Sequence, residues 1–140
     1  MNIEKLINEA EKGNTVAQTL LGMCYLDGVN VEENYPEAFR WLTIAAAKGS
    51  PRAKANLGVL YLEGWGTERN QPRAIELFLE AAKKGEFMPK ILLARIYVEE
   101  ENVESALFWY KEALGDRDHV DADEEIEEAL EYVSRFAVNQ

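Results

Sequence analysis

The sequence has a single cysteine, Cys24, and a single histidine, His119. One cysteine excludes an internal disulfide and any metal site built from several cysteines, and it agrees with a reducing compartment. Cys24 falls on the core side of a predicted helix, far from His119 in the chain. We therefore interpret Cys24 as a buried thiol and His119 as a solvated linker residue, and we expect no catalytic pair and no metal ligands.

Basic residues are also scarce. The chain has 15 Lys and Arg against 26 Asp and Glu, which gives a formal net charge of -11. Nucleic acids and anionic membrane surfaces both select for positive charge, so neither partner is expected. A neutral or basic protein is the partner that the charge favours.

Long apolar runs are missing too. No run approaches the roughly 20 residues that cross a bilayer. The first residues, Met1 to Gly13, carry acids where a signal peptide needs a basic start and an apolar stretch. We therefore expect a cytoplasmic protein. Walker-type loops and dinucleotide fingerprints are absent as well, so no cofactor and no small-molecule substrate are predicted.

What the sequence does contain is an internal repeat. Residues 15–50 laid over residues 51–86, at an offset of 36 and without a gap, give 14 identities. A third, shortened unit follows at residues 87–115, and residues 1–14 match the second half of a unit. An acidic segment, residues 116–140, completes the chain. We predict one helical repeat domain over residues 1–140.

Each unit reads as two helices. Small and apolar residues recur at helical spacing over 15–27, 51–63 and 88–99, and again over 35–48, 71–84 and 102–114. Gly49 and Gly85 follow these runs as helix C-caps, and Ser50 with Pro51 starts the next helix. Short connections make consecutive helices antiparallel, and a helix pair must stack on its neighbours to bury its apolar face. The predicted fold is an all-α, right-handed α-solenoid.

Two features of the repeat have a purely structural interpretation. Gly22 and Gly58 allow two helices to approach closely before larger side chains close the gap. In the long loop of the second unit, Gly66 tolerates a positive φ, and Asn30, the next best residue for that conformation, takes its place in the first unit. We therefore expect the loop shape to be kept.

The pattern Ala-x-x-x-Leu-Gly-x-x-Tyr-x-x-Gly, a turn, and Ala-x-x-(Trp/Leu)-x-x-x-Ala-Ala-x-x-Gly resembles the Sel-one-like repeat, a relative of the tetratricopeptide repeat. The third unit departs from it, with Ala94 and Glu100 in place of the two glycines. The resemblance implies a non-catalytic adaptor or scaffold whose first helices line a concave surface for a protein or peptide. It does not imply a particular partner.

The resemblance also implies which positions of the first helices face a partner. Nine of the fifteen are aliphatic or Met, which predicts a partly apolar trough. Val59 and Arg95 are expected to point into it, and Trp65, in its glycine-flanked loop, is a further contact candidate. Leu26, Leu62 and Val98 have an alternative role as contacts between adjacent first helices. The implied set is Val16, Thr19, Met23, Leu26, Asp27, Arg52, Ala55, Val59, Leu62, Glu63, Met88, Ile91, Arg95, Val98 and Glu99.

The acidic segment is predicted to be a capping helix. Asp121 with Glu124 resembles a capping box, and Ile126, Leu130, Val133 and Ala137 form one apolar stripe. The acids before the helix lack the glycine and the spacing of a calcium loop. Two alternatives to an adaptor remain open: a small acidic inhibitor or immunity-like protein, and an enzyme with an unrecognised site.

Overall fold

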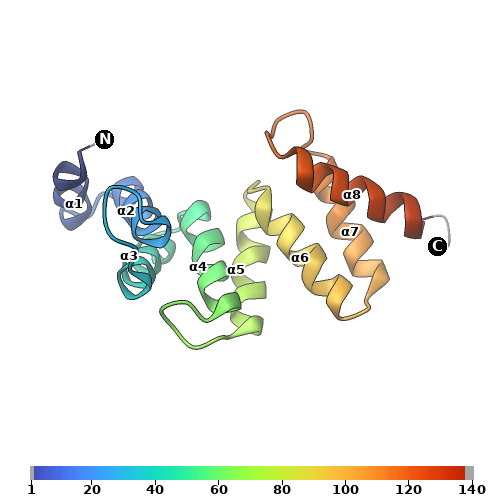
Figure 1. The fold of residues 1–140 in the computed structure, drawn as a ribbon, viewed down its shortest axis with the longest axis horizontal. Coiled ribbons are helices and arrows are strands. Elements are labelled where there is room, and N and C mark those ends of the chain that lie inside the picture. The colour runs from blue at the N-terminus through green and yellow to red at the C-terminus, as the bar shows by residue number, and fades with distance from the viewer. Residues whose placement is uncertain (1, 138–140) are drawn as a thin grey trace. The chain divides into compact units, whose positions relative to one another are not determined.

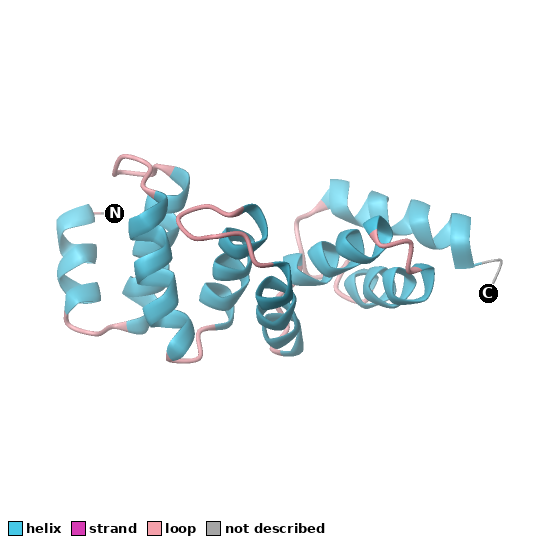
Figure 2. Ribbon diagram, turned by 90° about the horizontal axis from the view of Figure 1, so that it is seen from below, coloured by secondary structure: helices cyan, strands magenta, loops and turns pink. Residues whose placement is uncertain are grey.

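The computed structural model describes residues 2–137, and this range contains eight helices and no strand (Figures 1 and 2). The predicted helices agree with the observed ones to within a residue, and the all-α class is confirmed. The helices are α1 (Ile3–Glu11), α2 (Thr15–Asp27), α3 (Tyr35–Ala47), α4 (Pro51–Glu63), α5 (Gln71–Lys83), α6 (Met88–Glu99), α7 (Val103–Leu114) and α8 (Asp123–Phe136).

Local signals set the helix ends. The side-chain oxygens of Asn14, Asn34, Ser50 and Asn102 each accept a hydrogen bond from a backbone N–H in the first turn of the helix that follows. Gly49 and Gly85, the predicted C-caps, both adopt a φ of 96°, which a residue with a side chain rarely reaches. The connections between successive repeats are therefore short, as expected.

The chain forms two compact units, which divide between Ala81 and Ala82. In the first unit α1 packs on α2, α2 on α3, and α3 on α4, in chain order (Figure 1). The core of this unit includes the buried residues Leu21, Leu42, Leu57, Leu77, Ala38, Ala45 and Ala46. Leu57 of α4 packs in one cluster with Ala45 and Ala46 of α3.

The two repeat glycines lie at the closest approach of a helix pair. A Cβ added to Gly22 would lie 2.6 Å from Leu42 Cγ, and one added to Gly58 would lie 2.6 Å from Phe78 Cε1. Real Cβ atoms do not tolerate such distances, and both neighbours are fully buried. The structural interpretation of these glycines is confirmed.

A side-chain network joins α1 to the first complete repeat. Lys48 Nζ donates to the carbonyl oxygen of Gly13 at 2.8 Å and to Gln18 Oε1 at 3.1 Å. The amide nitrogen of Gln18 donates in turn to the carbonyl oxygen of Ala10 at 3.1 Å. The carbonyls at and just after the end of α1 therefore gain side-chain donors from α2 and from the end of α3.

The long loops also follow the prediction. Asn30 has a φ of 63° and Gly66 a φ of 76°, so asparagine keeps the left-handed position that glycine takes in the second repeat. In the shortened third repeat the loop between α6 and α7 is reduced to residues 100–102, and Glu101 takes the positive φ, at 58°.

In the second unit α7 packs on both α6 and α8. Its core includes Phe87, Ile91, Tyr110, Leu114 and Ala129. α8 therefore covers the last repeat helix, as a capping helix does.

Two details of the capping helix were predicted wrongly. Its N-cap is Ala122, and no side chain caps it, so the proposed capping box of Asp121 and Glu124 does not form. Asp123, Glu124 and Glu125 lie in its first turn, where negative charge suits the helix dipole. Ile126 and Val133 of the predicted stripe pack against the core that contains Ala129, but Leu130, the other stripe member between them, is 49% exposed.

Replacing Leu57 with Ala tests the stacked core. Leu57 is 2% exposed, so the change leaves a cavity that should cost about 2–5 kcal/mol of unfolding free energy. Leu79, which is exposed on α5, provides the control, since Leu79→Ala should change stability by less than about 0.5 kcal/mol. Thermal denaturation followed by circular dichroism measures both. Equal melting temperatures for the two variants would contradict the packing.

Replacing Gly58 with Ala tests the close approach. In an ordinary helix interior this change stabilises by about 1 kcal/mol. Here the added methyl meets the ring of Phe78, so we expect a loss of about 1–3 kcal/mol instead. The double variant Gly58→Ala, Phe78→Leu should lose less than the sum of the two single changes, because the ring is gone. Strict additivity in denaturant unfolding would show that the contact is relaxed.

Candidate functional site

The first helices of the first unit carry a pocket where α2 and α4 begin. It has a volume of about 340 Å³ and is largely apolar. Arg52 contributes its one charged side chain. The other residues of the lining include Val16, Thr19, Leu20 and Pro51.

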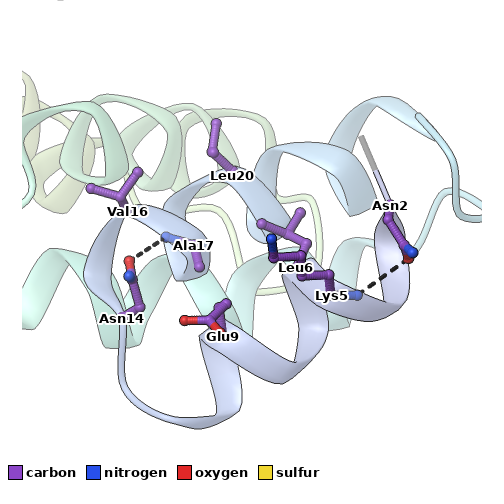
Figure 3. Close-up of a pocket in the computed structure, with 8 residues that line it drawn as sticks. All are labelled: Asn2, Lys5, Leu6, Glu9, Asn14, Val16, Ala17 and Leu20. Atoms are coloured by element: carbon purple, nitrogen blue, oxygen red, sulfur yellow. Dashed lines mark hydrogen bonds between the residues drawn. The ribbon is translucent and has the colours of Figure 1, made fainter.

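A second pocket, of about 470 Å³, lies between α1 and α2 (Figure 3). Leu6, Ala17 and Leu20 supply apolar surface, and Lys5 and Glu9 supply one charge of each sign. The hydrogen bond from the backbone N–H of Ala17 to Asn14 Oδ1, 2.9 Å long, fixes the start of α2 beside this pocket.

Val16 and Leu20 line both pockets. They lie one helical turn apart on α2 (Figure 3). Together they form an apolar ridge between two hollows, which we call the α2 ridge. Val16 is 68% exposed. Val16 therefore presents apolar surface to solvent, while Leu20 beside it is half-buried.

The structure brings three of the residues predicted for the first unit, Val16, Thr19 and Arg52, to the same pocket. Thr19 itself is buried, and its hydroxyl is hydrogen-bonded to Thr15 O and to Ser50 Oγ, both at 3.0 Å. Thr19 thus ties α2 to the start of α4 and offers little to a partner.

The remaining predicted positions of the first unit are spread along α2 and α4. Met23, Leu26, Ala55, Val59 and Leu62 are partly buried, while Asp27 and Glu63 are exposed. Sequence reasoning missed Leu20, although its spacing of four residues from Val16 places the two side chains on one face.

Trp65 lies on the loop between α4 and α5, and its side chain packs against Tyr35. Its ring stacks on that of Tyr35, with centroids 5.1 Å apart and planes 6° from parallel. A Cβ at Gly66 would lie against the carbonyl oxygen of Tyr35, so only glycine permits this approach. The loop of the second repeat is therefore fastened to the start of α3, with 37% of Trp65 left exposed.

In the second unit the structure corrects two predicted contacts. Ile91 is 0% exposed and belongs to the core that includes Ala129 of α8, so it offers no surface to a partner. Met88, Val98 and Glu99 are exposed.

Arg95 does not point into an open trough. Its Nε donates to both carboxylate oxygens of Glu128, at 3.0 and 3.2 Å, and its Nη2 donates to Oε1 at 2.6 Å. Tyr110 donates its hydroxyl to Glu128 Oε2 at 2.5 Å. Arg95 therefore anchors the capping helix, a role that sequence reasoning did not foresee because Glu128 lies on another helix.

This cluster shifts the pKa of each member. Burial alone would raise the pKa of Glu128, but the hydrogen bonds from Arg95 and Tyr110 outweigh it and lower that pKa below its usual range. The hydrogen bond to Glu128 raises the pKa of Arg95. Burial, aided by the contact with Glu128, raises the pKa of Tyr110. All three groups are held in the ionisation states that favour the contact.

Cys24 and Glu128 lack the pKa shifts of a catalytic nucleophile and of a general acid. Burial raises the pKa of the Cys24 thiol, with Asp27 adding to the effect, whereas a nucleophilic cysteine needs a lowered pKa. Glu128 is ionised and occupied by Arg95 and Tyr110, so it is no general acid. Within residues 2–137 no group of three or more His, Cys, Asp or Glu side chains is placed to hold a metal ion. In the same range, none of the helices is both long and apolar enough to span a bilayer.

Comparison with known proteins identifies the repeat. The model of the Sel1 repeat matches residues 15–50, 51–86 and 93–114. No curated protein matches the chain significantly.

Two solved structures are similar to the chain. One is c5321, a protective antigen of uropathogenic Escherichia coli strains that displays an SLR fold, with 32% identity and a TM-score of 0.75 over 81% of this chain. The other is a Sel1 repeat protein from Oxalobacter formigenes, with 32% identity and a TM-score of 0.66 over 73% of this chain. The matches cover 25% and 42% of those two proteins, so this chain corresponds to only part of each.

Replacing Glu128 with Gln tests the anchor of the capping helix. A carboxylate whose pKa is lowered by folding stabilises the protein above its unfolded pKa of about 4.3, and this contribution disappears as the pH falls through the folded pKa. We therefore expect the variant to lose about 1 kcal/mol at pH 7, since both partners are partly exposed, and to match the unchanged protein more closely near pH 3.

Denaturant unfolding at the two pH values measures the difference. Glu127→Gln, an exposed neighbour on the same helix, is the control and should change stability little at either pH. A loss for Glu128→Gln that is equal at pH 7 and pH 3 would contradict the ionic anchor.

Proposed function

Because the chain belongs to the Sel1 repeat family, whose members are generally protein–protein interaction modules, we propose that it is a non-catalytic adaptor that binds a protein or peptide partner on the face formed by its first helices. In this proposal the protein acts in the cytoplasm and needs no cofactor, nucleic acid, membrane or small-molecule substrate.

The observation that supports the proposal is the α2 ridge. Val16 stands between two largely apolar pockets and exposes 68% of its surface. Interfaces gain most of their binding energy where a few anchor side chains fill such pockets and exclude water. A partner that covers Val16 and places an apolar side chain in each hollow would bury surface that is now in contact with solvent.

The charge next to the ridge favours a partner that carries an acidic group beside its apolar anchor. Arg52 is the one charged residue of the pocket between α2 and α4, so an acidic group of the partner next to its apolar anchor would be matched there. Met23, one turn beyond Thr19 on α2, provides an adaptable side chain on the same helix. We include Val59, Ala55 and Leu62 of α4 in the proposed surface, and we leave out Thr19 and Ile91 because they are buried.

A second candidate is the acidic inhibitor or immunity-like protein, and the distribution of charge favours it. Residues from Ala82 onward contain fifteen acids and seven Lys or Arg, a net charge of −8, whereas residues up to Ala81 contain eleven and eight, a net charge of −3. A field of this sign would speed association with a basic target. Under this candidate the target binds the second unit rather than the α2 ridge.

Two changes, one that adds a charge to the α2 ridge and one that reverses the charge of the pocket beside it, distinguish the two candidates. We expect Val16→Glu and Arg52→Glu each to lower the recovery of the partner by about tenfold or more, because the first places a charge in an apolar contact and the second repels the matching acid. Recovery is measured by affinity capture from the native lysate with quantitative mass spectrometry.

Val29→Glu is the matched control. Val29 is an exposed valine on the loop after α2, outside the lining of both pockets, so its replacement should leave recovery unchanged. If all three variants recover the partner equally well while remaining folded by circular dichroism, the α2 ridge is not the binding site.

A further inference from the structure

A third pocket lies within the second unit, between the end of α6, the middle of α7 and the second half of α8. Its volume is about 240 Å³. Val98, Tyr110, Tyr132 and Phe136 give it an apolar and aromatic lining, and Glu128, Glu131 and Arg135 complete it. None of these residues belongs to the α2 ridge.

Three aromatic rings follow one another along this pocket. The ring centroids of Tyr110 and Tyr132 are 5.0 Å apart, and those of Tyr132 and Phe136 are 4.4 Å apart, with interplanar angles of 40° and 32°. The planes are tilted rather than stacked flat, so the rings form a curved wall. The face of an aromatic ring carries partial negative charge and attracts cations.

Carboxylates lie beside the same wall. Glu128 is occupied by Arg95 and Tyr110, and it holds the Tyr110 ring in place. Glu131 is exposed at the rim, and among residues 2–137 no ion pair engages its carboxylate. An exposed carboxylate next to aromatic faces combines the two groups that bind a guanidinium or ammonium ion.

The pocket already shows how a cation fits one of its rings. The guanidinium of Arg135 lies over Phe136, 6.0 Å from the ring centroid. This distance is at the outer limit of a favourable contact, and Arg135 is exposed. Tyr132, in the middle of the wall, has no such cation over it within the described residues.

We propose that this pocket binds the cationic side chain of an arginine or lysine presented by a basic segment of a protein partner. The aromatic wall contacts the apolar stem and the charged head, and Glu131 accepts a hydrogen bond from the head. The net charge of −8 on residues from Ala82 onward draws such a segment to this unit. This inference rests on the proposed function, because the cation belongs to a protein partner. The pocket, however, shares no residue with the α2 ridge.

Short peptides test the pocket without the native partner. We would add acetylated and amidated peptides with a central arginine, lysine, citrulline or glutamate between glycines to the full chain. Binding is followed by the backbone amide signals of Val98, Tyr132 and Phe136 in two-dimensional NMR spectra. We expect saturable shifts with the arginine and lysine peptides, and none with glutamate or with citrulline, which has the shape of arginine without its charge.

Three variants show whether the pocket attracts a positive charge. Glu131→Gln, at an exposed position, should weaken binding of the arginine peptide roughly two- to fivefold, and Phe136→Leu should weaken it by a similar factor. Arg135→Gln should strengthen it, because a like charge leaves the pocket. Glu124→Gln, exposed in the first turn of α8 and outside the pocket, is the control and should leave binding unchanged.

Two results would overturn the inference. Shifts of the same amides by the glutamate peptide, weakened by Arg135→Gln, would show a carboxylate site. An absence of saturable shifts with every peptide would show that the pocket binds none of these side chains. Recovery of the partner that depends on Val16 but not on Glu131 would support the adaptor proposal and reject the cation pocket. Recovery that depends on Glu131 but not on Val16 would reject the α2 ridge and leave the cation pocket in place.

Discussion

The architecture depends on how closely the two helices of a repeat approach each other. In the first two repeats this approach requires Gly22 and Gly58, because Leu42 and Phe78 occupy the space that a Cβ would need. The third repeat has Ala94 in that place, fully buried in the core that also contains Tyr110. At the repeat position of Leu42 and Phe78, Tyr110 adds a hydroxyl, which reaches Glu128 of the capping helix. The side chain at this core position of the third repeat therefore makes a polar contact that holds the capping helix.

The sequence predicted the features that depend on neighbouring residues. Helix bounds follow from caps such as Asn14, Ser50 and Gly49, and the left-handed conformation of Asn30 follows from its alignment with Gly66. The repeat adds strength to these local signals because each is present twice. Membership of the Sel1 repeat family was therefore visible in the residues themselves.

What the sequence could not predict depends on which residues meet across helices. Arg95 was assigned to the partner from its place in the repeat, but Glu128, 33 residues later, takes its guanidinium. Ile91 was assigned in the same way and is buried in the core shared with α8. The error at Arg95 arises because α8, a capping helix, takes the place of a further repeat and supplies Glu128. Burial at the position of Ile91 has another origin, because Thr19, its equivalent in the first repeat, is buried as well.

The network of Lys48, Gln18 and the end of α1 bears on how such chains can evolve. Repeats of equal length invite recombination between copies, and a loss of residues 15–50 would leave the period intact. Lys54, which forms an ion pair with Glu80 at 3.1 Å, would then stand in the place of Gln18, and Lys84 is the repeat equivalent of Lys48. The hydrogen bond between Lys48 and Gln18 would be lost, and the carbonyl oxygen of Ala10 would lose its side-chain amide donor. The copies are therefore alike in backbone but differ in the contacts that they make at their junctions.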